Sequence, residues 1–303
     1  MANLQGIKHR IGSTKKTRQI TNAMYMVSSS KLNQILRYTS KYLDYANHVE
    51  DIIAHLSQGN FLKQKEKSSI PFLAKRKVNK TALLVITSDR GLVGSYNNQV
   101  LKKTDRLISK NNLTPKNTLI FSIGSKGTDY YRKKGFKIAF QNLAIGDVPK
   151  FWEVFDLVKE ITKEYSSYQF DALKIVYSHN VNRLVNRVII KDLLPIDENN
   201  FKKDKKGKLI NNKYTNANVD YDFEPSPQSL LKSILPQYVR SLLYGIILDS
   251  KTSEHSSSVT AMQSATDNAD DMVSSLNLRY NRARQAAITT EITEITGGQA
   301  ALQ

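Results

Sequence analysis

The feature that most constrains this chain is a long segment at each end that contains nothing to interrupt an α-helix. No proline occurs from Asn3 to Leu56, and the only glycines there are Gly6 and Gly12. Proline breaks helices and glycine weakens them, so the composition permits one continuous helix. At 1.5 Å per residue that helix would extend roughly 80 Å, much more than a globular domain needs.

Every third or fourth residue of this first segment forms a heptad seam that is apolar at both ends and polar in the middle. Its members are Leu4, Ile7, Ile11, Thr14, Arg18, Thr21, Tyr25, Ser28, Leu32, Ile35, Thr39, Tyr42, Ala46, Val49, Ile53 and Leu56.

The other end of the chain has the same character. Ser226 and Pro227 suit an N-cap and a first helical position, and Pro236 is expected to kink the first turns. Apolar pairs then recur at helical spacing, and after the polar stretch Ser250 to Ser258 a seam resumes. The seam residues are Val259, Met262, Thr266, Ala269, Val273, Leu276, Tyr280, Ala283 and Ala287.

Two helices of this length are most economically buried by packing on each other as an antiparallel coiled coil. That arrangement predicts Leu4 near Tyr280 and Leu56 near Gln228. It also leaves the tail from Gln285 to the end without a partner in the chain, so we expect this tail to lie inside another protein. An ordinary amphipathic bundle is the alternative, disfavoured by the polar middle of both seams.

The middle of the chain alternates predicted strands and helices, which is typical of an α/β domain with a mostly parallel sheet. We expect strands at 81–87, 118–123, 137–140, 172–178 and 183–191, and helices at 98–109, 126–134 and 151–165. The predicted fold is therefore a long antiparallel coiled coil flanking a central Rossmann-like α/β domain. Its expected parts are 1–58 (helix), 59–80 (connection), 81–225 (α/β domain, with a Lys/Asn-rich surface loop at 202–218) and 226–303 (helix).

No motif in this domain predicts catalysis. The loops SDRGLVGS and GSKGTD match neither dinucleotide-binding nor P-loop patterns, although a nucleotide-using enzyme remains an alternative for such a sheet. The five histidines lack metal-ligand spacing, the acidic group of Asp267, Asp270 and Asp271 suits a solvated helix face, and there is no cysteine. We therefore expect no catalytic residue, cofactor or metal site.

Charge is the property that calls for a partner. The formal net charge is +18, and the first acidic residue is Asp44. Such a field attracts polyanions or acidic protein surfaces. Nucleic-acid binding is thus a competing hypothesis, but zinc-finger, RNP and basic-zipper signatures are absent. No apolar run approaches the ~18 residues of a membrane span, and the first residues do not resemble a secretory signal.

Three motifs carry a resemblance to a known family. The opening IKHRIGSTKKTRQITNAMYMVSSSKL, the central SDRGLVGSYN, and the closing SEHSSSVTAMQSATDNADD with LNLRYNRARQAAITTEITEITGG resemble the gamma subunit of F-type ATP synthase. Departures occur at Ser258 and Val259, where the family usually has a basic residue and Met. The lack of cysteine excludes the regulatory cysteine pair of the chloroplast type.

The resemblance implies a single non-catalytic rotor stalk per complex. It would couple proton flow through the c ring to ATP synthesis or hydrolysis at beta-subunit sites. The implied partners are three alpha and three beta subunits, the epsilon subunit and the c ring, with no nucleic acid and only indirect membrane contact. Because the chain begins directly on the motif, we expect a bacterial protein, peripheral on the cytoplasmic side of the inner membrane.

The resemblance also implies contact residues. Met24 and Lys31 match the motif that faces the acidic lever segment of the beta subunit, and Arg284 and Gln285 match a pair that engages a beta-subunit loop. Tyr221 and Glu224, in YDFEPSP, match the foot near the c ring and the epsilon subunit.

Overall fold

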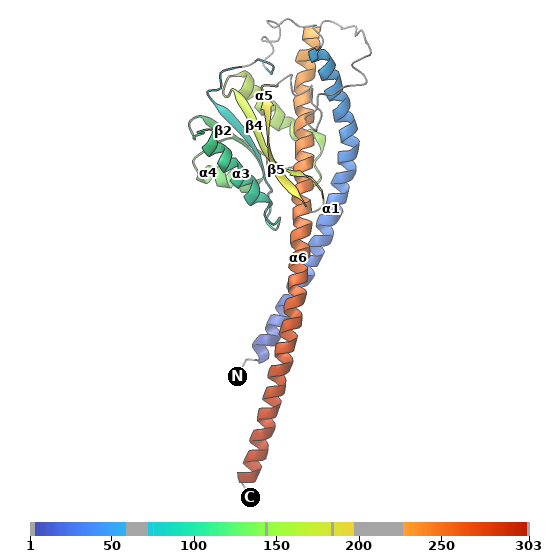
Figure 1. Ribbon diagram of the computed structural model, residues 1–303, viewed down its shortest axis with the longest axis vertical. Helices are drawn as coiled ribbons and strands as arrows, with labels where there is room; N and C mark the ends of the chain where they lie inside the picture. Colours follow the sequence, from blue (N-terminus) through green and yellow to red (C-terminus); the bar gives the residue numbers. More distant parts are fainter. Residues whose placement is uncertain are drawn as a thin grey trace. The chain divides into compact units, whose positions relative to one another are not determined.

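The computed structural model describes residues 4–58, 72–74, 76–142, 145–182, 185–196 and 227–301 (Figure 1). The chain divides into two compact units, one of Met1–Ser30 with Ser258–Gln303 and one of Lys31–Ser257. We call them the shaft unit and the domain unit and describe each by itself. Two long helices contribute to both, α1 (Leu4–Gln58) and α6 (Pro227–Ala301). As expected from the sequence, α6 begins at Pro227, and Pro236 lies inside it.

The shaft unit is an antiparallel pair of helices joined along the predicted seams. Ser28 Oγ lies 3.1 Å from Ser258 Oγ, Thr266 Oγ1 donates to Thr21 Oγ1 at 2.8 Å, and Arg18 Nη1 lies 3.0 Å from Asp270 Oδ1. The buried apolar residues Met262, Ala269 and Leu276 fall on the predicted seam of α6. Continuing this register places Leu4 opposite the turn of α6 near Arg284, about one turn beyond the predicted Tyr280.

Small side chains explain how the polar middle of the seam can be buried. A serine or threonine hydroxyl can donate to a carbonyl of its own helix or to a hydroxyl across the interface. Thr21 donates to Arg18 O at 3.0 Å, and Thr266 donates to Met262 O at 2.9 Å as well as to Thr21. The polar middle is therefore hydrogen-bonded, not a defect in the packing.

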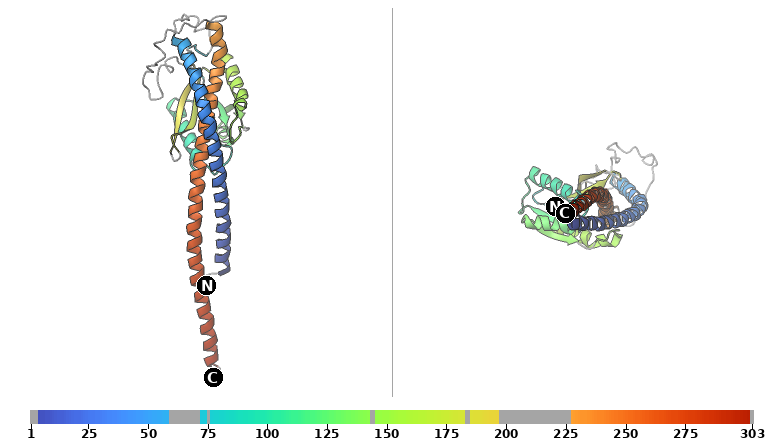
Figure 2. Two further views of the ribbon diagram at one scale, coloured as in Figure 1. Left: turned by 90° about the vertical axis from the view of Figure 1, so that its right-hand side faces the viewer. Right: turned by 90° about the horizontal axis from the view of Figure 1, so that it is seen from below.

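Beyond Ala287, every described side chain of α6 is exposed up to Gln299. This bare end includes Ile288, Ile292 and Ile295, which are 46%, 55% and 69% exposed. Figure 2 shows α6 continuing past the N-terminal end of α1. The sequence predicts that this tail has no partner within the chain, and that remains a prediction beside the observed exposure of Ile288 to Gln299.

The domain unit is built on a five-stranded sheet in the order β3-β2-β1-β4-β5. The strands are β1 (Thr81–Ile86), β2 (Thr118–Ile123), β3 (Lys137–Asn142), β4 (Ala172–Asn180) and β5 (Asn186–Leu194). All neighbouring pairs are parallel except β4 and β5. The predicted α/β fold is confirmed, and the last two predicted strands form an antiparallel pair.

Helices cover both faces of this sheet because residues of its central strands alternate between two cores. Leu83 and Val85 of β1 pack with α3 (Tyr96–Lys110) and α4 (Ser125–Lys133), which lie on one side of the sheet in Figure 1. Leu84 and Ile86 face a larger core that contains α5 (Phe155–Ser166) and parts of α1 and α6. The predicted helix at 151–165 is split, because its first turn is the 3-10 helix η1 (Phe151–Val154).

Within the domain unit, α1 and α6 pack through tyrosines against small residues. The Tyr42 hydroxyl contacts the backbone oxygen and the hydroxyl of Ser241, and its ring meets Tyr244 edge-on at 4.8 Å. A Cβ on Gly245 would lie only 3.1 Å from the Tyr42 ring, so glycine provides the space for this approach. Burial raises the pKa of Tyr42 to about 12, and the phenol therefore stays protonated as a donor.

The segment boundaries expected at 58/59, 80/81 and 225/226 remain predictions. The two compact units have other boundaries, because each contains part of α1 and part of α6. The Lys/Asn-rich loop 202–218 and the pairing of Leu56 with Gln228 fall outside the described residues and side chains.

The register of the shaft unit can be tested by disulfide formation. We expect the double variant Ser28→Cys, Ser258→Cys to oxidise readily to an intramolecular disulfide, because its side chains already meet across the helix pair. The natural chain has no cysteine, so no other thiol interferes. Mobility on a non-reducing gel gives the yield. The control is Ser28→Cys with Ser264→Cys, since Ser264 is exposed on the same helix. Equal yields for the two pairs would contradict the register.

Candidate functional site: helix surfaces and the sheet edge

The residues expected to contact the beta subunit lie on the two long helices. Arg284 and Gln285 are exposed on α6 in the shaft unit, just before the bare end, whereas Met24 is half-buried on α1. Lys31 is half-buried on α1 in the domain unit. The structure thus brings Arg284 and Gln285 together on one helix. Tyr221 and Glu224 lie outside the described residues.

The carboxyl ends of the parallel strands are where α/β proteins usually bind ligands. Here the loop after β2 packs against the loop after β1. The N-terminal amides of α4 are already occupied, because Ser125 N donates to Asp89 Oδ1 at 2.9 Å and Gly127 N donates to Thr87 Oγ1 at 2.9 Å. These amides would otherwise hold a phosphate. Asp89 supplies the negative charge that a nucleotide would bring.

Gly124 shows how closely the two loops approach each other. Its φ is +88°, and a Cβ there would lie 2.2 Å from Thr87 O. Only glycine fits this position. The contact closes the sheet edge at the point where a nucleotide enzyme would need an open cradle, which argues against the nucleotide-using alternative.

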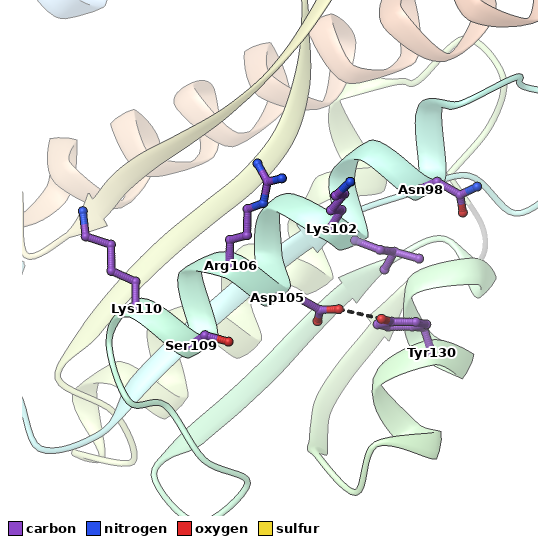
Figure 3. Close-up of a pocket in the computed structure, with 8 residues that line it drawn as sticks. Asn98, Lys102, Asp105, Arg106, Ser109, Lys110 and Tyr130 are labelled. Atoms are coloured by element: carbon purple, nitrogen blue, oxygen red, sulfur yellow. Dashed lines mark hydrogen bonds between the residues drawn. The ribbon is translucent and has the colours of Figure 1, made fainter.

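A shallow groove of about 760 Å³ runs along α3 beside Tyr130 (Figure 3). Its single carboxylate, Asp105, points toward Tyr130, whose hydroxyl donates to Asp105 Oδ2 at 2.5 Å. Tyr131 and Lys134 also donate to Asp105, at 3.3 Å and 2.8 Å. The carboxylate is therefore committed to joining α3 and α4, which leaves it poorly suited to act as a general base.

A buried polar cluster on α6 is the feature that sequence analysis missed. In the sequence, Ser250 to Ser258 is a polar stretch between two seams, but the structure buries Ser250 to Ser256 in the domain unit. Lys251 Nζ lies 2.9 Å from Glu254 Oε2, and the two side chains are only 5% and 10% exposed. Ser250 is hydrogen-bonded to the buried Tyr96 hydroxyl at 2.7 Å. The only available signal was a lysine three residues before a glutamate.

His255 completes this cluster. Burial lowers the pKa of His255, although nearby Asp147 opposes the shift. Its Nε2 is buried without a hydrogen-bond partner among the described residues. Burial also raises the pKa of Glu254, with Lys251 acting in the opposite direction. Burial therefore favours the neutral imidazole of His255, while Lys251 favours the ionised form of Glu254 against the effect of burial.

A second histidine pairs with an aspartate at the end of β4. His179 Nδ1 lies 2.6 Å from Asp249 Oδ2, and Asn180 N donates to Asp249 Oδ1 at 2.9 Å. Burial raises the pKa of Asp249 despite both contacts. Both Asp249 oxygens are used to attach α6 to β4. Among the described residues, no group of three or more His, Asp or Glu side chains could hold a metal ion.

Known proteins match this chain over its full length, and a solved structure shares its fold. A family model described as ATP synthase matches residues 3–302. The ATP synthase gamma chain of Oenococcus oeni is 62% identical over 303 residues, 100% of both chains, and that of Limosilactobacillus reuteri is 47% identical over 310 residues, 99% of both. A chain in the cryo-EM structure of the Euglena gracilis mitochondrial ATP synthase OSCP/F1/c-ring assembly shares the fold, with a TM-score of 0.64 at 16% identity, covering 99% of this chain and 94% of that one.

The shaft unit is a helix pair with a bare end, the domain unit is an α/β sheet with closed loops, and these features together with the matches indicate a stalk-type protein. The full-length matches identify the family to which this stalk-type protein belongs. The chain belongs to the family of ATP synthase gamma chains. The resemblance stated from the three sequence motifs is thereby confirmed.

No helix among the described residues is sufficiently long and apolar to span a bilayer.

The lowered pKa of His255 predicts a specific pH dependence. Because the folded chain holds this group neutral to a lower pH than the unfolded chain does, the unfolded chain binds more protons just below pH 6.5. The resulting stability is present above that pH and is lost as pH falls. We expect His255→Gln to lose less stability than the natural chain between pH 7.5 and 5, measured as the urea midpoint. The variant His9→Gln, at an exposed site, is the control. Parallel profiles for the natural chain and His255→Gln would contradict the assignment.

Proposed function

We propose that this chain is the rotating central shaft of an F-type ATP synthase, coupling proton flow through a c ring to ATP synthesis or hydrolysis on beta subunits. The single observation that carries the proposal is the bare end of α6. It is a helix that continues beyond its mate with every described side chain exposed from Ile288 to Gln299. An exposed apolar helix of this kind needs a surrounding protein to cover it.

The composition of the bare end supports rotation within that surrounding protein. Between Gln285 and the C-terminus, the only charged side chains are Glu291 and Glu294. A fixed ion pair with the surrounding protein would favour one orientation over the others. A surface of isoleucine, threonine and alanine contacts its neighbours without directional bonds, which suits a part that must turn.

We propose further that the chain is non-catalytic. The closed sheet edge supports this, because Asp89 and Thr87 occupy the amides that would bind phosphate. Nucleotide chemistry would then belong to the beta subunits of a complex that contains three alpha and three beta subunits, an epsilon subunit, a c ring and one copy of this chain. The similarity to bacterial gamma chains supports a site on the cytoplasmic side of the inner membrane, reached only through the c ring.

The contact residues belong to the same proposal. Arg284 and Gln285 would engage a beta-subunit loop, while Met24 and Lys31 would face the acidic lever segment. The exposure of Arg284 and Gln285, one turn before the bare end, supports the first assignment. Tyr221 and Glu224 would contact the c ring and the epsilon subunit.

Reconstitution tests the shaft function directly. We expect the purified chain alone to hydrolyse no ATP, and ATPase activity to appear when it is combined with alpha and beta subunits of a close relative. Phosphate release measures both. The same mixture without the chain is the control. Hydrolysis by the chain alone, or a complex whose activity does not depend on it, would contradict the proposal.

The assigned loop contact is tested by substitution. Replacing Arg284 and Gln285 by Ala should lower ATP turnover of the assembled enzyme roughly ten- to a hundredfold, since hydrogen bonds to charged groups contribute roughly 1.5–3 kcal/mol. Assembly, followed by size-exclusion chromatography, should be unchanged because both side chains are exposed. Arg279→Ala, at another exposed arginine of α6, is the matched control. Unchanged turnover in the double variant would show that the loop is engaged by other residues.

A further inference from the structure

Positive side chains form a row along the groove beside α3 (Figure 3). Three of the residues that line this groove are Lys102, Arg106 and Lys110, and all three are exposed. They are four residues apart, so they lie on one face of the helix. At 1.5 Å per residue, the row extends roughly 12 Å along α3. A ligand that approaches the groove from solvent therefore meets three cations in succession.

The single carboxylate of the groove does not neutralise this row. Figure 3 shows Asp105 turned toward Tyr130, whereas Arg106 and Lys110 project from another side of α3. Asp105 accepts hydrogen bonds from Tyr130 at 2.5 Å and from Lys134 at 2.8 Å. None of the three cations makes an ion pair with a carboxylate in the part of the chain that the structure describes. Their charge is therefore left for a partner outside the chain.

The groove offers little apolar surface to a protein partner. Protein interfaces are centred on apolar and aromatic side chains that become fully buried on binding. Leu101, the aliphatic residue that lines the groove, is only 9% exposed before any partner binds. The lining also includes Asn98 and Ser109, whose side chains can donate hydrogen bonds. Cations and neutral donors with little apolar surface favour a small polyanion over a protein segment.

Tyr130, the one aromatic residue among those that line the groove, is poorly placed to stack on a base. It is half-buried, and its ring centre lies 4.4 Å from Lys134 Nζ. The same ring meets Tyr131 edge-on, with ring centres 5.1 Å apart. Single-stranded nucleic acids bind through bases stacked on aromatic rings. Because this ring is already contacted by a cation and by another ring, we expect the groove to recognise phosphate and not a base.

We propose that the groove along α3 binds a chain of linked phosphates, supplied either by inorganic polyphosphate or by the triphosphate of a free nucleotide. The planar guanidinium of Arg106 suits bidentate contact with one phosphate, and the lysine on each side of it supplies a point charge for the next. A single phosphate could not reach all three cations of the row. The site goes beyond the shaft function and is not catalytic, since it lies along α3 and not at the closed loops of the sheet edge.

Calorimetric titration of the purified full chain with sodium tripolyphosphate tests the proposal. The salt concentration is about 0.15 M, at which exposed charges farther apart than about 8 Å are largely screened. We expect saturable binding of tripolyphosphate, and binding of orthophosphate at least about tenfold weaker, because orthophosphate cannot reach the whole row. No binding of tripolyphosphate, or equal affinity for orthophosphate, would overturn the proposal.

Substitution locates the site. The double variant Lys102→Gln, Arg106→Gln should weaken tripolyphosphate binding about tenfold or more, because charge-assisted hydrogen bonds to phosphate are lost. The matched control is Lys15→Gln, Lys16→Gln, which removes the same charge from exposed positions of α1 and should leave the affinity unchanged. Equal weakening in the two variants would show that the basic surface binds without a defined site, and the proposal would fail.

Nucleotides distinguish the two sources of the phosphate chain. Titration with ATP in the absence of magnesium should give an affinity comparable to that of tripolyphosphate if a free nucleotide can supply the chain, and no binding if only the inorganic polymer fits. AMP should not bind in either case. Binding of AMP, or an affinity for ATP far above that for tripolyphosphate, would mean that the base is recognised, which contradicts the proposal.

Lysine acetylation on the natural chain provides a measurement without substitution. Tripolyphosphate should reduce modification of Lys102 and Lys110 by acetic anhydride several-fold, as measured by mass spectrometry of the peptides, because a bound anion covers these amines. Modification of Lys15 and Lys16, which are exposed on α1, should not change. Equal protection of both pairs, or no protection of Lys102 and Lys110, would overturn the proposal.

Discussion

Two helices as long as α1 and α6 persist in water only where each covers the apolar seam of the other or packs on a domain. In the shaft unit, the seam is closed by short side chains, with serine against serine and threonine against threonine. In the domain unit, Gly245 admits the ring of Tyr42 close to the backbone of α6. In both units, small residues therefore allow the backbones of α1 and α6 to approach closely. Larger residues at these points would separate the helices and expose the seam.

The hydroxyl pairs also favour one register of α1 against α6. A seam of leucines can slip by a heptad at little cost, whereas a slip here would separate the hydroxyl pairs and lose their hydrogen bonds, which contribute about 0.5–1.5 kcal/mol each. The pairs Ser28 with Ser258 and Thr21 with Thr266 thus favour one register. The exposed Arg18–Asp270 pair adds little energy, since solvent screens it, but it agrees with the same register.

Sequence periodicity could predict the helices, the seams, the strands and the bare end, because each follows from the spacing of apolar residues or the lack of a partner. It could not predict the buried cluster of Lys251, Glu254 and His255. Charged residues in a serine-rich stretch are typical of a solvated surface, and only the tertiary packing of α6 in the domain unit takes them out of water. The groove between α1 and the segment from Val148 to Trp152 could not be predicted from the sequence either, since its walls come from segments more than a hundred residues apart.

Burial of charge on α6 also bears on how force can pass through this helix. An ion pair such as Lys251 with Glu254 is not needed for stability, since apolar side chains of similar size often serve as well. Breaking it, however, leaves a buried unpaired charge and costs about 3–5 kcal/mol. Because both residues lie on α6, three residues apart, the pair moves with the helix. Displacement of α6 in the domain unit is resisted instead by the hydrogen bonds of Ser250 with Tyr96 and of Asp249 with His179 and Asn180. The bare end of the same helix has no such penalty, because its threonine hydroxyls are bonded to carbonyls of their own helix. One helix thus combines a segment that is held firmly with a segment that makes no directed contact, which is the combination that a turning shaft requires.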